Sequence, residues 1–145
     1  MYMMKIGYGL CVQNSAEAVE FYKKVFGLEL GYHVKNPDGS YFHSELNKDG
    51  EEFMCVVERP NGGVGEQIVQ LGVTFDSEDE VQKAYALLSE GGAVETPIGP
   101  LPWSPCSGSL IDRFGVWWFI TAPMHRPPDD YDPTAPWDAS MYKRP

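Results

Sequence analysis

The sequence predicts an α+β fold in which two βαβββ modules form a curved mixed sheet around a central cup, with the helices outside. An internal repeat is the first reason, since a shift of 63 positions (85 − 22) lays Tyr22 on Tyr85 and Val25 on Leu88. Alternation is the second reason. In the first strand expected in each module, large apolar residues alternate with small or polar ones. One face would therefore pack a core, while the other would leave space for a ligand.

The first module, residues 3–59, begins with an expected strand over 5–12. A helix should follow, because Asn14 and Glu17 form a variant of the capping box and an apolar stripe at helical spacing runs up to Gly27. Three more strands are predicted, with turn-forming residues between them. They lie at 28–34, 41–46 and 51–58.

The second module, residues 67–122, follows a Gly-rich linker over 60–66 and repeats this order. Its helix should begin at a capping box of Ser77 and Glu80 and end near Gly91 or Gly92. The strands are expected at 70–75, 93–98, 107–112 and 115–122.

Residues 1–122 are thus expected to form a single domain, and residues 123–145 a C-terminal arm. The arm is rich in Pro and Asp and has no periodicity. Two alternatives stay open for it. It is ordered if Tyr131, Trp137 or Tyr142 docks on the domain or on a partner subunit, and it is a disordered tail otherwise.

Composition excludes several partners. Eleven Lys and Arg against 21 Asp and Glu give a net charge of −10, which argues against nucleic acid or an anionic membrane surface as a partner. No apolar run is long enough to cross a bilayer, and the first ten residues do not resemble a signal peptide. Three cysteines without metal-type spacing fit reduced thiols in the cytoplasm.

Three segments carry a family resemblance: residues 17–30, residues 42–46, and a W…G…D-x-F-G…W series. Together they resemble the vicinal oxygen chelate superfamily of glyoxalases, bleomycin-resistance proteins and extradiol dioxygenases, and within it the PhnB-like branch. In the series, Arg113 replaces the usual Pro and Val116 the usual His. The resemblance covers about residues 3–122 and implies the fold more strongly than any activity. The series consists of Trp103, Gly108, Asp112, Phe114, Gly115 and Trp118.

The resemblance also implies where a metal would bind, since metal-dependent members take ligands from the first and last strands of each module. Those positions fall on Gly7, near Val56, on Gln70 and on Phe119. The first, second and fourth lack a donor atom, and an amide is a poor ligand for a transition metal. A slip of two residues would bring in Glu58, but one carboxylate and one amide cannot hold a catalytic metal. We therefore expect no metal and no cofactor.

His43 and Glu45 lie two apart in an expected strand, so they share a face, and Phe42, Ser44 and Leu46 take the other. The apolar pair belongs under a helix, which points His43 and Glu45 into the cup. Three interpretations stay open: the beginning of a metal site, a hydrogen-bonded pair that shapes a ligand or acts as general base, or an ordinary polar wall.

The adjacent tryptophans should have different roles. Trp117 shares the cup face with Phe119, whereas Trp118 points toward the helix and belongs to the core. Trp103, in a loop before a strand, either closes the rim of the cup or packs in the core. The segment Asp112–Gly115 is a turn without a catalytic role.

The cysteines are assigned separately. Cys106 is expected in a loop near the rim, either as a nucleophile or as a cysteine that is inert or touches the ligand. Cys11 should line the cup, and Cys55 should lie on the helix side of its strand.

These features favour a small-molecule-binding protein, with sequestration or drug resistance as one version. The ligand would lie against Trp117, Phe119, Met54 and Val56, with polar contacts from His43, Glu45 and Gln70, and with Trp103 at the rim. Two alternatives remain: a metal-dependent glyoxalase- or dioxygenase-like enzyme with non-standard ligands, and a scaffold whose cup is filled by its own side chains. Because relatives commonly pair as two-fold dimers, a homodimer is expected, and the arm could extend its interface.

Overall fold

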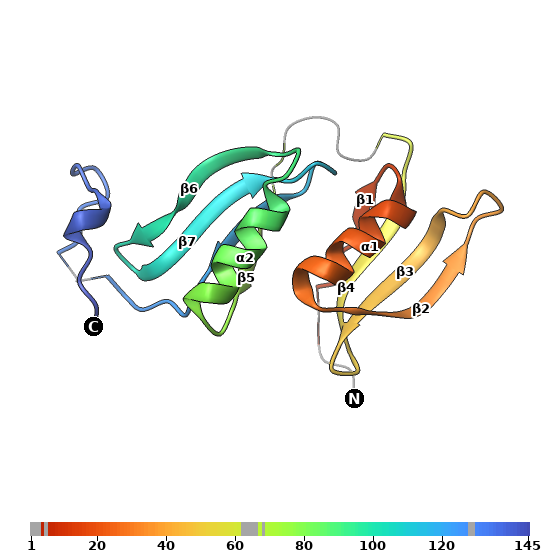
Figure 1. The fold of residues 1–145 in the computed structure, drawn as a ribbon, viewed down its shortest axis with the longest axis horizontal. Coiled ribbons are helices and arrows are strands. Elements are labelled where there is room, and N and C mark those ends of the chain that lie inside the picture. Colours follow the sequence, from red (N-terminus) through yellow and green to blue (C-terminus); the bar gives the residue numbers. More distant parts are fainter. Residues whose placement is uncertain (1–3, 5, 62–66, 68, 128–129) are drawn as a thin grey trace. The chain divides into compact units, whose positions relative to one another are not determined.

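The computed structural model describes residues 4, 6–61, 67, 69–127 and 130–145. Its contacts divide the chain into two units, Met1–Gly65 and Glu66–Pro145. In the described part, each unit has one four-stranded sheet and one α-helix (Figure 1). Lys5 of the first predicted strand, residues 62–66 of the predicted linker and residues 128–129 of the arm lie outside the described residues.

Unit 1 is a βαβββ module, as predicted. Its sheet has the order β1-β4-β3-β2, in which β1 runs parallel to β4 and the other neighbours are antiparallel. The strand β1 is shorter than expected. Glycines at positions 7 and 9 weaken a strand, and Ile6 and Tyr8 before it are 95% and 46% exposed. The elements are β1 (Leu10–Val12), α1 (Ser15–Phe26), β2 (Glu29–Lys35), β3 (Tyr41–Lys48) and β4 (Glu51–Glu58).

Unit 2 repeats this topology with the sheet order β5-β8-β7-β6, so the predicted internal repeat is confirmed. The paired strands β6 and β7 are longer than predicted and leave only a tight turn between them. The elements are β5 (Leu71–Thr74), α2 (Glu78–Leu88), β6 (Ala93–Leu101), β7 (Ser104–Ile111) and β8 (Trp117–Thr121), followed by a short 3-10 helix, η1 (Ala139–Met141).

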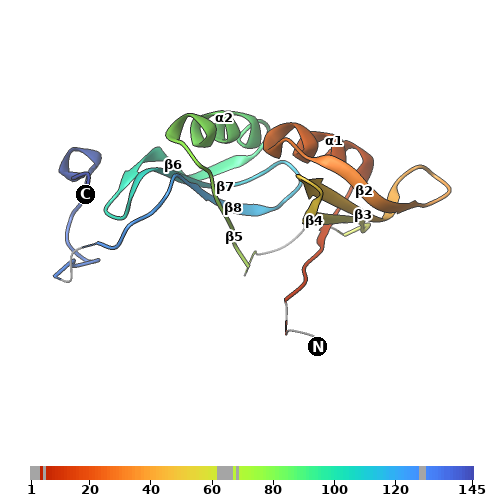
Figure 2. The ribbon, with the colours of Figure 1, turned by 90° about the horizontal axis from the view of Figure 1, so that it is seen from below.

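Each helix covers one face of its own sheet (Figure 2). Since strand residues alternate between faces, each sheet has a helix-covered face that is buried and a helix-free face that is more exposed. The buried side chains define two cores. In unit 1 they include Val12, Val19, Tyr22, Leu46, Met54 and Val56, and in unit 2 Val81, Leu88, Leu110, Trp118 and Ile120.

The N-terminus of α1 is capped by a residue distant in sequence. Asn14 has a left-handed backbone (φ 60°) and its side chain makes no capping hydrogen bond, so the predicted capping box is wrong. Instead, the carboxylate of Glu58 in β4 accepts hydrogen bonds from the backbone N–H of Asn14 (3.2 Å) and from the N–H and hydroxyl of Ser15 (2.9 and 2.8 Å). A carboxylate here satisfies free helix donors and complements the helix dipole.

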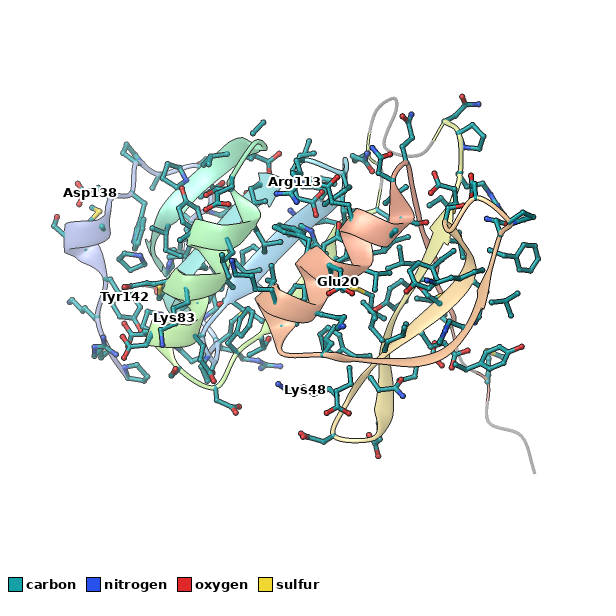
Figure 3. All side chains as sticks on the ribbon, turned by 45° about the vertical axis from the view of Figure 1, so that its right-hand side comes forward. Glu20, Lys48, Lys83, Arg113, Asp138 and Tyr142 are labelled. Atoms are coloured by element: carbon teal, nitrogen blue, oxygen red, sulfur yellow. The ribbon has the colours of Figure 1, made fainter. Side chains whose placement is uncertain are left out.

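The other helix ends follow the sequence more closely. Gly27 ends α1 in the left-handed conformation (φ 65°), and Lys48 Nζ (Figure 3) donates to the Phe26 carbonyl at 3.1 Å. At α2, Ser77 Oγ accepts from the N–H of Glu80, which confirms the predicted cap. The Glu80 carboxylate accepts from the N–H of residue 76 instead of residue 77.

A buried carboxylate organises the turn between β7 and β8. Asp112 is 3% exposed, and its Oδ1 accepts from the N–H groups of Phe114 (2.9 Å) and Val116 (3.1 Å). Its Oδ2 accepts from the indole Nε1 of Trp118 at 2.9 Å. Gly115 has the positive φ (91°) that the turn requires. The predicted turn role of this segment is confirmed, and the turn is also fastened to the core.

The described part of the C-terminal arm docks on unit 2. The Tyr131 ring packs edge-on against Trp103, with centroids 6.1 Å apart. The His125 N–H donates to the Trp103 carbonyl at 2.8 Å, and Arg144 pairs with Glu78 at 3.0 Å. These contacts are the ones that the ordered alternative requires, and order of the arm in solution stays a prediction.

The Asp112 contacts predict a clear stability effect. Asp112→Ala should lower the free energy of unfolding by about 3 kcal/mol, because several buried donors lose their acceptor. Asp112→Asn should cost less, because the amide oxygen still accepts from the backbone N–H groups of the turn. Its NH2 group, however, would face the indole N–H of Trp118, so that hydrogen bond is lost. Trp118→Phe added to Asp112→Asn should then cost less than in the wild type. Urea unfolding of the four variants measures this, and additive losses in the double variant would contradict the assigned hydrogen bond.

The cap supplied by β4 gives a second prediction. Glu58→Ala should destabilise the protein by about 1–2 kcal/mol, as expected for a lost helix cap, while Glu58→Gln should cost less because its amide oxygen still accepts. Chemical unfolding measures both, with the exposed Glu20→Gln as the control. Equal stability of Glu58→Ala and the wild type would contradict the capping role.

Candidate functional site

Strand register decides which predicted site residues lie on a helix-free face, because residues directly opposite each other on neighbouring strands share a face. Met54 pairs with Leu46 and Val56 pairs with Ser44, and all four are buried. Met54 and Val56, at 1% and 0% exposure, therefore belong to the core of unit 1. The expectation that Met54 and Val56 line a cup was therefore wrong. In the β3–β4 hairpin they lie opposite buried residues of β3, on the face that the helix covers.

A bulge in the β2–β3 pair corrects a second expectation. The register shifts between Val34 and Lys35, so Tyr41 takes the buried position at the start of β3. Phe42 is 63% exposed and does not lie under the helix.

The helix-free face of unit 1 carries a hydrogen-bonded row of three side chains. His43 Nε2 lies 2.8 Å from Glu45 Oε2, and Cys55 Sγ lies 3.7 Å from His43 Nδ1. His43 and Glu45 lie on the face away from the helix, as predicted. Of the three interpretations left open for them, their geometry fits the hydrogen-bonded pair. Cys55 pairs with Glu45 across β3 and β4, so its assignment to the helix side was wrong. The register of the predicted hairpin is the signal that would have placed it.

The electrostatics of this row favour a neutral thiol at Cys55. Partial burial raises the pKa of the Cys55 thiol, and the carboxylates of Glu52 and Glu45 raise it further. A raised pKa keeps the thiol protonated at neutral pH. It can then donate to Nδ1 of His43, while Nε2 donates to Glu45. This arrangement orients the imidazole but does not produce a reactive thiolate.

Cys106 is not a rim nucleophile. It lies within β7, not in a loop, and its side chain is buried. Burial and the nearby Glu78 carboxylate raise its thiol pKa, so the unreactive thiol is the dominant form at neutral pH. Of the two alternatives, the structure supports the inert one.

The helix-free face of unit 2 centres on a carboxylate that the sequence reasoning missed. The hydroxyl of Ser109 and the indole Nε1 of Trp117 both donate to Glu95 Oε1, at 2.9 and 3.1 Å. Phe119 lies opposite Ser109 and shares this face, whereas Trp118 is buried on the other. The faces predicted for the adjacent tryptophans are confirmed. A register shift between residues 94 and 96 obscures the alternation of faces in β6. The sequence still offered one signal for this site, because Glu95 is the single acidic residue among 93–101.

The remaining predicted site residues lie at strand ends. Trp103 lies in the turn between β6 and β7 and packs against the arm through Tyr131. Gln70 is exposed immediately before β5. Contact of either residue with a ligand stays a prediction.

The positions mapped for a family metal do not fit one. Val56 is buried in the core and has no donor atom, and Phe119 is likewise a hydrocarbon. Glu58, the carboxylate that a register slip would have supplied, already accepts three hydrogen bonds at the start of α1. Among the described residues, no three His, Cys, Asp or Glu side chains converge in a way that could hold an ion.

Comparison with known proteins identifies the fold family. A model of the Glyoxalase/Bleomycin resistance protein/Dioxygenase superfamily matches residues 6–120. An uncharacterized protein of Mycobacterium bovis is 31% identical over 123 residues, covering 79% of this chain and 80% of the relative.

Solved structures agree with this match. The PhnB protein of Bacillus cereus is 26% identical, with a TM-score of 0.67 over 83% of this chain and 100% of that one. The fosfomycin resistance protein FosX of Listeria monocytogenes shares the fold at 16% identity, with a TM-score of 0.61 over 85% and 95% of the two chains.

None of the helices in the described part of the chain is long and apolar enough to span a bilayer. With the repeated βαβββ topology and the matching family model, the chain belongs to the Glyoxalase/Bleomycin resistance protein/Dioxygenase superfamily, the vicinal oxygen chelate family that its sequence resembles.

Proposed function

We propose that this protein binds a small organic molecule on the helix-free face of unit 2 and does so without a metal. The observation that carries the proposal is the shared acceptor on unit 2, where Ser109 and Trp117 fix one carboxylate oxygen of Glu95 beside aromatic surface. Binding sites typically combine a few fixed polar groups with apolar and aromatic walls.

The chemistry of this face indicates what it would bind. Oxygen Oε1 of Glu95 already accepts two hydrogen bonds, and no group among the described residues donates to Oε2. That oxygen can accept from a ligand N–H or O–H, and a hydrogen bond to a charged acceptor is strong. The half-exposed rings of Trp117 and Phe119 supply flat surface for an aromatic or apolar ligand.

The helix-free face of unit 1 offers polar contacts of another kind, which we propose separately from those of unit 2. The His43–Glu45 pair presents an oriented imidazole on this face, and Cys55 fixes the tautomer by occupying Nδ1. Within unit 2, Gln70 and Trp103 are the remaining residues that we propose for ligand contact. Met54 and Val56 are not proposed for ligand contact, because they lie in the core.

A binding role also agrees with the donor chemistry. The superfamily's enzymes need a divalent metal to polarise oxygen atoms, and the residues at the mapped positions are poor ligands. FosX, which shares the fold, is described as a fosfomycin resistance protein, and a mutant of it is described in complex with Mn(II), so FosX illustrates the metal-dependent alternative. Sequestration is the version of the function that requires no chemistry on the bound molecule. Free thiols at Cys11, Cys55 and Cys106 support a cytoplasmic location.

Ligand binding on unit 2 can be tested with a library of planar aromatic compounds that carry an N–H or O–H donor. We expect quenching of tryptophan fluorescence by some members and, in calorimetric titrations of these, at least about tenfold weaker binding to Glu95→Gln, since a hydrogen bond to a charged acceptor is lost. Trp117→Leu should weaken the same ligands, whereas Glu20→Gln on the outer face of α1 should not (Figure 3).

Two results would count against this site. One is the absence of any fluorescence response across the library. The other is a ligand that binds Glu95→Gln and Trp117→Leu as tightly as the wild type.

We also propose that the protein forms a homodimer. The edge strand β2 and its neighbour β3 expose three large apolar side chains, Tyr32, Val34 and Phe42. Exposed apolar groups on an edge strand are typical of surfaces that meet a partner.

Light scattering during size-exclusion chromatography should give twice the 16.2 kDa of one chain. Phe42→Glu should return the mass to that of one chain. Val94→Glu, at an exposed apolar position of unit 2, should remain dimeric. A wild-type protein that is already monomeric, or a dimer broken only by Val94→Glu, would contradict the proposal.

A further inference from the structure

A separate cavity of about 520 Å³ lies at the C-terminal arm, within unit 2. Nearly all of its lining comes from residues beyond 120, where the family match ends. Its walls include three aromatic rings and two cations besides the ion-paired Arg144. These are Tyr131, Trp137, Tyr142, Arg126 and Lys143.

The arm residues around the cavity are held in place by contacts at several points. Tyr131 packs on Trp103, and the Tyr142 ring lies 5.9 Å from the His125 ring. Asp138 (Figure 3) caps η1 by accepting from the N–H of Ser140 at 2.8 Å. The short helix η1 in turn contacts β6. The cavity is therefore framed by docked side chains.

The charged side chains that line the cavity are cationic, although the chain as a whole carries −10; the one anionic group in the described lining is the terminal carboxylate of Pro145. Arg144 is paired with Glu78, at 3.0 Å. Arg126 and Lys143 have no carboxylate partner among the residues that the structure describes. The arm's Asp132 and Asp138 bind their own neighbouring Thr134 and Ser140, and neither lines the cavity.

We propose that this cavity binds a planar aromatic anion, such as an aryl carboxylate. The tyrosine and tryptophan rings would stack on the flat part of the ligand, and Arg126 and Lys143 would pair with its charge. The volume lies within the range of about 300–1,000 Å³ that is usual for small-molecule sites. The inference is independent of the ligand proposed for the helix-free faces, since no lining residue belongs to those faces.

The test compares 2-naphthoate with its neutral methyl ester, which has no N–H or O–H donor for Glu95, by calorimetry and by amide chemical shifts of the full chain. We expect naphthoate to bind more tightly than the ester, to shift arm residues, and to weaken as salt is added. In the double variant Arg126→Gln/Lys143→Gln, naphthoate should bind at least about tenfold more weakly, while binding of the ester should be little affected. Trp137→Leu should weaken both probes, by about three- to tenfold.

The controls separate this cavity from the sheet faces. Lys24→Gln removes an exposed cation of α1, and Trp117→Leu alters the helix-free face of unit 2; neither should change the naphthoate shifts in the arm. Unchanged thermal unfolding of the variants excludes misfolding as the cause of any loss. Equal binding of the two probes by the wild type, unchanged naphthoate binding by the double variant, or shifts confined to β7 and β8 would each overturn the proposal.

Discussion

The structure depends on one constraint: a single helix covers a single face of each four-stranded sheet. Because strand residues alternate, this cover assigns every strand position either to a core or to a helix-free face. Met54, Val56 and Trp118 are buried for this reason. His43 and Glu45 in unit 1 and Trp117 and Phe119 in unit 2 are left for other uses.

Three carboxylates show how the fold distributes its acids. The carboxylate of Asp112 accepts hydrogen bonds from a turn and from the indole of Trp118, and that of Glu58 accepts hydrogen bonds from the start of α1. Both are structural, and neither has the freedom that a metal ligand or a general base needs. Glu95 differs, because it is exposed and one of its oxygens has no donor among the described residues. The proposed function therefore relies on hydrogen bonding and aromatic contact.

The sequence was most informative where the physics is local. Periodicity located both helices, the repeat gave the topology, and Gly27 and Ser77 marked helix ends correctly. It failed where a distant strand intervened. Only the β1–β4 pairing brings Glu58 to the helix start that Asn14 was expected to cap. Candidate site residues on β4 were given the wrong face because a one-residue error in register reverses every side chain. Glu95 was missed because an irregular strand hides its alternation.

The central claim is that the helix-free face of unit 2 binds its ligand without a metal. The most direct measurement is a calorimetric titration with a library ligand that quenches tryptophan fluorescence. It is made on three samples: protein purified without chelators, protein stripped with EDTA, and stripped protein with added manganese, nickel or zinc. The metal content of each sample is measured. The account predicts substoichiometric metal and the same dissociation constant in all samples. A stoichiometric ion held by protein groups, with binding lost on stripping and restored by the metal, would contradict it.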